Sequence, residues 1–252
     1  MIGVSHGWHV HCSGIPPSME HKSSLPSRDS SAGGFTLVEL VFVIAIITVL
    51  ASIFLPTAFQ KLQKADEVSA DSSVQAIAAA LAGFYTDLRA FPTCHTGSCA
   101  AFPGSSNQLV FLAFGDGYGS QTTDYPSAAT GSGNWDLTAN DEATPERNNG
   151  ANHLVQNDPD TNGTSGESTD YRTSGRLRWR GPYLGRFGLD PWGRTYIAYV
   201  GAMEASGKKV SGSSGQHSGW ILSAGPNGSL DTLPSSNSLA GDDRGFVFHS
   251  QQ

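Results

Sequence analysis

Apolar positions are densest between residues 35 and 55, where a single acidic residue, Glu39, interrupts an otherwise hydrophobic run. A helix rises about 1.5 Å per residue, so this run is long enough to cross a hydrocarbon core of roughly 30 Å. The small residues Ala32, Gly33 and Gly34 precede the run, whereas a secretory signal peptide has small residues after its apolar core. The pattern therefore predicts a transmembrane helix over residues 35–55; a buried core helix is the alternative.

Beyond this run, the apolar positions recur at the helical spacing of three and four residues. They are Val74, Ile77, Leu81, Phe84 and Leu88, and the alanines between them favour a helix. We therefore expect one long helix from about residue 35 to residue 90, apolar on all sides at first and amphipathic over residues 56–92. Pro56 removes the backbone hydrogen bond to Ser52, so it is expected to kink this helix.

The pattern changes again after Pro92. Residues 93–180 are rich in Gly, Ser, Thr, Asn and Asp, which predicts a loop-rich insertion with one short strand near residues 109–114. Aromatic and β-branched residues return after residue 180, and "TYIAYV" predicts a strand that follows a turn at Asp190-Pro191-Trp192-Gly193. These elements predict an α+β fold, in which the long helix packs on a small antiparallel sheet within residues 181–252.

Composition narrows the function without identifying one. The formal net charge is −7, which argues against nucleic acid as a partner because phosphate binding needs a basic surface. The GxSxG and HExxH motifs and a phosphate-binding glycine loop are absent from the sequence. The histidines of the polar stretches are expected to be solvated: His95, His153, His217 and His249. We therefore expect a protein that is not an enzyme, with an anchored hydrolase as the weaker interpretation.

Residues 34–39, with the sequence GFTLVE, resemble the processing site of type IV pilins and of type II secretion pseudopilins. In that family an inner-membrane peptidase cleaves after the glycine and methylates the new amino terminus. The resemblance implies cleavage after Gly34, methylation of Phe35 and removal of a leader formed by residues 1–34. It also implies that Glu39 is the fifth residue of the mature chain, where the family has its glutamate.

Glu39 is costly at this position, because a carboxylate within a bilayer is unfavourable by about 2.5–3.5 kcal/mol on insertion scales. Cleavage creates a second charge, the amine of Phe35, and two opposite charges offset each other's desolvation. The resemblance implies that these charges pair between neighbouring subunits and fix the axial stagger of a filament. A glutamate that simply reaches the membrane surface is the alternative.

The leader departs from the family, whose leaders are short and basic. Residues 1–34 are formally neutral, and Met1 and Met19 are both candidate starts, of which the second gives a leader of more ordinary length. Lysines 61 and 64 lie on the far side of the apolar run, so the charge distribution does not set its orientation. The resemblance alone implies a cytoplasmic leader and a periplasmic head.

Cys94 and Cys99 follow the long helix, and they are the only cysteines once a leader containing Cys12 is removed. In an oxidising periplasm, an even pair this close favours a disulfide, and two free thiols are the alternative. The CxxCH order needed for covalent haem attachment is absent.

An alternating acidic stretch lies in the inserted segment. Asp158, Asp160 and Asn162 are followed by Gly163, as in the first half of a calcium loop. Thr169 stands where such a loop has its bidentate glutamate, with Glu167 and Asp170 nearby. An Asx-rich turn without metal is the favoured interpretation, and a calcium site is the weaker one.

The C-terminal third also resembles the head of the major pseudopilin of type II secretion. A Gly-Pro-Tyr, Asp-Pro-Trp-Gly and Ser-x-Gly series occurs in the family's order, at residues 181–183, 190–193 and 223–225. The resemblance covers residues 35–92 and 180–232, whereas the segment between them is much longer than the family's equivalent. It implies a calcium loop near the C-terminus, in which Asn227, Asp242 and Asp243 take the family's positions. Asp231 is an additional oxygen ligand within reach of the same turn, and an acidic tail that binds no metal is the alternative.

The resemblance further implies a single-pass inner-membrane protein that polymerises with itself and with minor pseudopilins into a periplasmic filament for protein export. Its partners would be a prepilin peptidase and methyltransferase and an inner-membrane secretion platform with a cytoplasmic ATPase. The alternative is a type IV pilin or minor pilin of a surface fibre for adhesion, motility or DNA uptake, which the long insertion favours.

Overall fold

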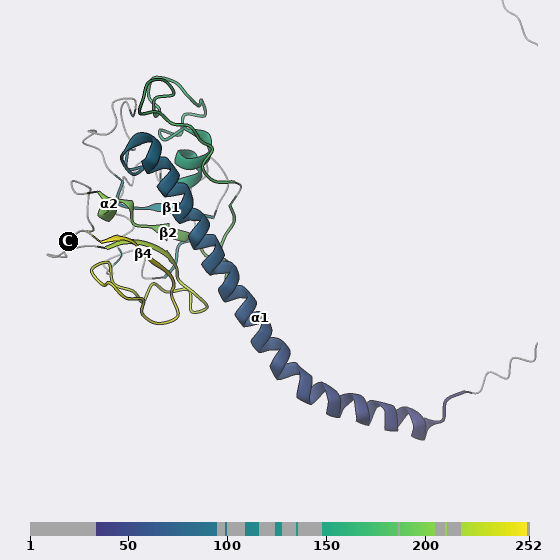
Figure 1. Ribbon diagram of the computed structural model, residues 1–252. Helices are drawn as coiled ribbons and strands as arrows, with labels where there is room; N and C mark the ends of the chain where they lie inside the picture. Colours follow the sequence, from purple (N-terminus) through teal and green to yellow (C-terminus); the bar gives the residue numbers. More distant parts are fainter. Residues whose placement is uncertain are drawn as a thin grey trace, which may run out of the picture. The chain divides into compact units, whose positions relative to one another are not determined.

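The computed structural model describes residues 34–94, 99, 109–115, 124–127, 135, 148–185, 187–204, 210 and 218–250. Within these residues the chain forms helices α1 (Leu37–Leu88) and α2 (Val200–Met203), the π-helical segment η4 (Asn152–Gln156) and four strands (Figure 1). The chain divides into two compact units, Met1–Ser52 and Ile53–Gln252. The first part of α1 belongs to the first unit, and the second unit is the head.

Local hydrogen bonds define both ends of α1, where intrahelical partners are missing. At the start, the Thr36 hydroxyl accepts a hydrogen bond from the backbone nitrogen of Glu39 over 3.2 Å, so Thr36 is the N-cap. At the end, Arg89 has a left-handed φ of 61°, and its backbone nitrogen donates to the carbonyl of Tyr85. The predicted long helix is confirmed. It continues through Pro56, and the kink at this residue stays a prediction.

The first half of α1 has the properties of a membrane segment. It contains an 18-residue window with a mean hydropathy of 2.8, none of which is buried. The hydroxyls of Thr48 and Ser52 donate to the carbonyls of Ala45 and Val49, over 2.8 and 2.7 Å. These two side chains therefore need no water, which is what lipid surroundings require. This half of α1 fits a single-pass membrane anchor.

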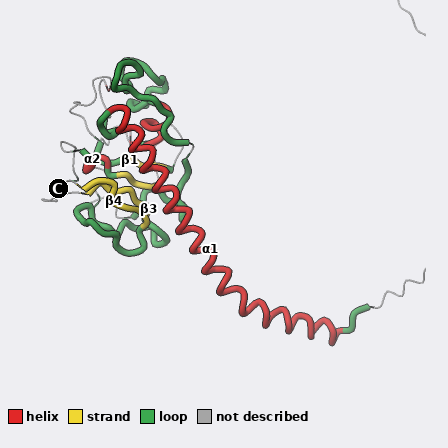
Figure 2. The backbone as a smooth tube through the Cα atoms, viewed as in Figure 1, coloured by secondary structure: helices red, strands yellow, loops and turns green. Residues whose placement is uncertain are grey.

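The second half of α1 buries the predicted face. Its buried residues are Ala70, Val74, Ile77, Ala78, Ala80, Leu81, Phe84 and Leu88. All of them except Ala70 share one hydrophobic core with residues of the sheet, among them Leu112, Tyr196 and Ile221. The helix therefore covers one face of the sheet, against which it lies in Figure 2.

The sheet has four antiparallel strands in the order β1-β2-β3-β4: β1 (Leu112–Phe114), β2 (Tyr196–Ala198), β3 (Ser218–Ser223) and β4 (Arg244–Ser250). Ala113 pairs with Ile197, and Ile197 in turn pairs with Leu222. A register shift between Gly219 and Trp220 interrupts the pairing of β3 with β4. The predicted α+β class, a long helix on a small antiparallel sheet, is confirmed.

The other face of the sheet carries a second hydrophobic core. Its buried members are Val110, Phe111, Ala113, Trp135, Ile197, Tyr199, Ala202, Val210, Trp220, Leu222, Ala224 and Leu230. The indole nitrogen of Trp135 donates to the carbonyl of Thr232. The segment 93–180, expected to be mainly a surface loop, thus supplies both strand β1 and part of the cover of the sheet. The head is therefore larger than residues 181–252.

A single buried carboxylate explains two of the sequence motifs of the head. The predicted turn is confirmed, since the backbone nitrogen of Gly193 donates to the carbonyl of Asp190 over 2.9 Å. Asp190 Oδ1 accepts hydrogen bonds from the backbone nitrogens of Trp192 and Arg194, over 3.0 and 2.8 Å. Its Oδ2 accepts one from the Ser223 hydroxyl over 2.6 Å. The Asp-Pro-Trp-Gly turn is thereby joined to the Ser-x-Gly motif at the end of β3.

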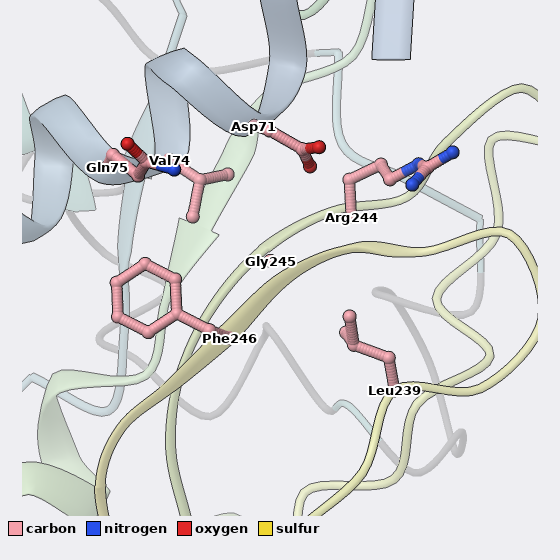
Figure 3. Close-up of a pocket in the computed structure, with 7 residues that line it drawn as sticks. All are labelled: Asp71, Val74, Gln75, Leu239, Arg244, Gly245 and Phe246. Atoms are coloured by element: carbon pink, nitrogen blue, oxygen red, sulfur yellow. The ribbon is translucent and has the colours of Figure 1, made fainter. Parts of the chain in front are cut away.

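A pocket of about 370 Å³ lies between the head half of α1 and the start of β4 (Figure 3). Its lining residues are Asp71, Val74, Gln75, Leu239, Arg244, Gly245 and Phe246. Arg244 forms an ion pair with Glu67, which lies one turn before Asp71 on α1. A hydrogen bond from Lys64, 3.0 Å away, and the charge of Arg244 lower the pKa of the Glu67 carboxyl. The ion pair links the start of β4 to α1 beside the pocket.

Candidate processing, assembly and metal sites

Gly34 and Phe35 lie in the non-helical segment just before α1. Apart from Gly34 itself and its two chain neighbours, no atom of the described residues lies within 4 Å of the position that a Cβ would take on Gly34. The Phe35 side chain is 81% exposed. A peptidase can therefore reach the bond between these residues without unwinding the helix. The structure places both processing residues at an accessible position, and cleavage itself stays a prediction.

Glu39 lies in the first turn of α1 and is exposed. The N-cap uses only its backbone nitrogen, so its carboxylate is not needed to begin the helix. Among the described residues, no cationic side chain forms an ion pair with this carboxylate. The positive end of the helix dipole favours a negative charge here and disfavours a free amine on Phe35. After cleavage, the amine would therefore gain from a nearby carboxylate.

Apart from Thr36, the exposed residues around Phe35 and Glu39 are apolar. Leu37, Val38 and Phe42 are 78%, 75% and 69% exposed, and the large hydrophobic residues that follow along the anchor are exposed too. Exposed apolar surface of this extent marks a membrane or protein interaction site. After cleavage, the Phe35 amine and the Glu39 carboxylate would thus lie at the edge of an apolar surface that lipid or protein is expected to cover.

Cys94 and Cys99 are joined by a disulfide, with their Cα atoms 5.9 Å apart. Both are buried and belong to the core that α1 forms with the sheet. The backbone nitrogen of Cys99 donates to the carbonyl of Thr169 over 2.9 Å. The short disulfide loop is therefore attached to the segment that leads into Tyr171.

We expect the purified, processed protein to contain no free thiol. Because both sulfurs are buried, the titration must be made in denaturant, before and after reduction, and should find no thiol and then two. A precursor that begins at Met1 keeps Cys12, so its single thiol before reduction is an internal control. Two thiols in the unreduced, processed chain would contradict the disulfide.

The residues of the expected C-terminal calcium loop lie together between β3 and β4. Asn227 donates from its backbone nitrogen to Asp242 Oδ2 and from its side-chain amide to Asp231 Oδ2, both over 2.8 Å. Asp243 Oδ2 accepts hydrogen bonds from the backbone nitrogens of Asp231 and Thr232, over 3.0 and 2.7 Å. Burial raises the pKa of the Asp243 carboxyl. N–H donors thus occupy one oxygen of each carboxylate, and calcium binding here stays a prediction.

A tighter acidic group lies in the inserted segment. One carboxylate oxygen from each of Asp158, Asp160 and Asp170 lies within 4.8 Å of the other two. Asp158 accepts hydrogen bonds from the backbone nitrogens of Asn162 and Gly163, over 3.2 and 3.1 Å. Burial, together with the charges of Asp160 and Asp158, raises the pKa of the Asp170 carboxyl to about 6. The sequence pattern did not assign Asp170 to the group, because it lies one position beyond the twelfth of a calcium loop.

His153 differs from the expectation of a solvated histidine. It is fully buried, and its Nδ1 lies 2.8 Å from the hydroxyl of Tyr171. The polar stretch that contains it forms the segment η4, whose Leu154 is also buried. His95 and His217 lie outside the described residues, as does the side chain of His249. His153 is therefore part of the packed interior of the head.

Comparison with known proteins finds one match, at the N-terminus. Residues 29–55 match the family model described as the prokaryotic N-terminal methylation motif. No curated protein and no solved structure matches the chain. The matched residues include the processing site, Glu39 and the apolar run.

Proposed function

We propose that this chain, a type IV pilin-like protein by its N-terminal methylation motif, is a pseudopilin subunit of a type II secretion system. The observation that carries the proposal is the form of α1: a fully exposed apolar half follows directly on an accessible cleavage site. A processed subunit of this form stays in the membrane until other copies cover its apolar half. Filament assembly provides that cover.

The charged groups of the mature N-terminus would control the assembly. Cleavage after Gly34 places the Phe35 amine four residues before Glu39, at the edge of the apolar surface. Neither group is stable alone in lipid, because a charge there has no water to solvate it. In the filament, Glu39 of one subunit would bind the Phe35 amine of the subunit that is being added. Both charges are paired only when the two subunits have the correct axial stagger. The subunit would thereby leave the membrane for one specific position.

The head supports the secretion role over the surface fibre. Asp190 joins the Asp-Pro-Trp-Gly turn to Ser223, so the two motifs that resemble the major pseudopilin form one structural unit. The other candidate, a type IV pilin or minor pilin, is favoured by the inserted segment 93–180. That segment supplies part of the cover of one face of the sheet and adds surface that a displayed fibre could use.

In the proposed role the chain is a structural subunit, and the work is done by its partners. A prepilin peptidase would process it, and an inner-membrane platform with a cytoplasmic ATPase would extract it from the membrane. The chain would contribute the repeating shape of the filament, together with minor pseudopilins. The calcium loop formed by Asn227, Asp231, Asp242 and Asp243 would stabilise the head of each subunit in this role.

Deletion of the gene distinguishes the two candidates. We expect the deletion to remove a set of folded proteins from the culture medium while surface fibres, counted by electron microscopy, stay unchanged. Re-expression of the gene from a plasmid should restore secretion, and a copy with a blocked processing site, Gly34→Val, should not. Lost fibres with unchanged secretion would overturn the secretion role and favour the pilin.

A further inference from the structure

We infer that residues 158–170 form a calcium site whose carboxylate ligands are Asp158, Asp160 and Asp170. One oxygen from each lies within 4.8 Å of the other two. Calcium binds oxygen at about 2.3–2.6 Å, so two ligands on opposite sides of one ion are about 4.6–5.2 Å apart. The three carboxylates are therefore close enough to share a single ion. The inference is independent of whether the filament serves secretion or a surface fibre.

Asp170 provides the strongest evidence for a ligand. Its side chain is fully buried, and its Oδ2 accepts a hydrogen bond from the backbone nitrogen of Glu167 over 2.9 Å. Its Oδ1 is buried and has no hydrogen-bond partner among the described residues. A buried carboxylate oxygen without a donor is unfavourable, and a cation would satisfy it. Asp158, only 4% exposed, places a second buried carboxylate beside it.

The hydrogen bonds of the loop show where the cation would enter. The side-chain amide of Asn162 donates to Asp160 Oδ2 over 3.1 Å and also to Glu167 Oε1. In this arrangement an N–H₂ group is the electropositive partner of two carboxylates. A cation is a stronger partner for the same oxygens. Rotation of the amide would turn the Asn162 oxygen towards it, in exchange for the hydrogen bond of 2.8 Å that this oxygen accepts from the backbone nitrogen of Thr164. Asn162 and Glu167 are therefore the additional side-chain ligands.

The ligand set selects calcium by its chemistry. The group consists of carboxylate and amide oxygens, whereas zinc prefers sulfur and imidazole nitrogen. Magnesium requires a near-ideal octahedron and keeps several of its waters, while calcium accepts six to eight oxygens in irregular geometry. Three carboxylates on an irregular loop, with Glu167 as a fourth, suit calcium better.

The site would fasten the inserted segment to the core of the head. Asp170 is followed by Tyr171, whose ring is fully buried and lies 5.0 Å from that of Phe84 on α1 in an edge-to-face contact. On the other side, Asn157 precedes Asp158, and its side-chain amide donates to the carbonyl of Tyr171 over 3.0 Å. The two ends of the loop thus meet at Tyr171. An ion that holds Asp158 and Asp170 together closes the loop at this point.

The test measures thermal unfolding of the full-length protein in detergent, with calcium, with magnesium or with chelator. To exclude the C-terminal loop, the background is Asp231→Asn with Asp242→Asn, two isosteric changes that remove its exposed charges. Calcium at 100-fold above its Kd should raise the Tm of this background by about 5–10 °C. Magnesium at the same concentration should have a smaller effect.

Adding Asp170→Asn to this background should remove the calcium shift while the Tm in chelator stays the same or rises, because a buried negative charge is lost. Terbium luminescence sensitised by the adjacent Tyr171 should disappear with the same variant, which shows loss of the ion even if stability changes. An unshifted Tm in the background protein would overturn the inference. A calcium shift that survives Asp170→Asn would overturn it too.

Discussion

Replacing Glu39 with alanine is expected to abolish filament assembly while leaving membrane insertion and cleavage intact. The N-cap of α1 uses the backbone nitrogen of Glu39, so the helix still begins at the same residue. Insertion becomes easier, because a carboxylate is removed from the membrane segment. In the variant, assembly would leave the Phe35 amine in an apolar environment without its carboxylate partner. Breaking a buried charge pair in this way costs about 3–5 kcal/mol. Each contact between subunits would then be weakened by roughly 10²–10⁴-fold.

Three measurements separate these steps. Fractionation should find the variant in the inner membrane, N-terminal sequencing should find Phe35 as the first residue, and sheared filaments should be absent by electron microscopy. Glu39→Gln is the matched control for shape, because it keeps a polar side chain of the same size without the charge. It should fail to assemble as well. Normal filaments from Glu39→Gln would show that charge pairing does not hold the subunits together.

Replacing Phe84 with alanine is expected to lower the free energy of unfolding of the head by about 3–5 kcal/mol. Phe84 is fully buried, and its ring makes edge-to-face contacts with Tyr171 and Tyr183, whose ring centroids are 5.0 and 5.6 Å away. The truncation leaves a cavity where α1, the inserted segment and the Gly-Pro-Tyr segment meet. A loss of this size is a large part of the stability of a typical domain.

The measurement is denaturant unfolding of the full chain in detergent, followed by near-ultraviolet circular dichroism, which reports on the aromatic core of the head. Phe59→Ala is the matched control, since it makes the same change on the same helix where the side chain is 61% exposed. It should change the free energy by no more than about 0.5 kcal/mol. Equal effects of the two substitutions would contradict the assignment of the buried face.

The long helix could be predicted in full because its signals are local. Val74, Ile77, Leu81, Phe84 and Leu88 repeat at the period of the helix itself, and all five are buried. The turn at Asp190 was equally readable, since proline and glycine fix its conformation. What local patterns could not show was the bond from Ser223 to Asp190, because it joins residues that are 33 positions apart.

The two-sided burial of the sheet was not predicted. Trp135 is an isolated hydrophobic residue among polar and glycine-rich positions and carries no periodic signal, yet it is buried in the second core. Val110 lies in the apolar run 109–114, which does not show by itself that both faces of the sheet are covered. Strand β4 was also missed, although the run "FVF" within it has the aromatic and β-branched composition of a strand.

The candidate sites also differ in whether their residues are close together in the sequence. Gly34, Phe35 and Glu39 lie within six consecutive residues, so a short motif was enough to predict their roles, which stay predictions. The acidic group of the inserted segment was only half visible, since Asp158 and Asp160 follow a calcium-loop spacing but Asp170 does not. Asp170 joins the group because the loop folds back at Tyr171, and a rule based on sequence spacing does not describe this fold.

The order of the strands along the chain determines how late the head can complete its fold. The hydrophobic face of α1 packs on β2 and β3, which follow it by more than a hundred residues, and β4 closes the edge of the sheet only at residues 244–250. Contacts this distant in sequence fold slowly, because the loops between them must close first. The apolar face of the helix therefore stays uncovered until the last part of the chain has folded onto the sheet. We expect this interval to be the one in which the protein is most exposed to proteases and chaperones.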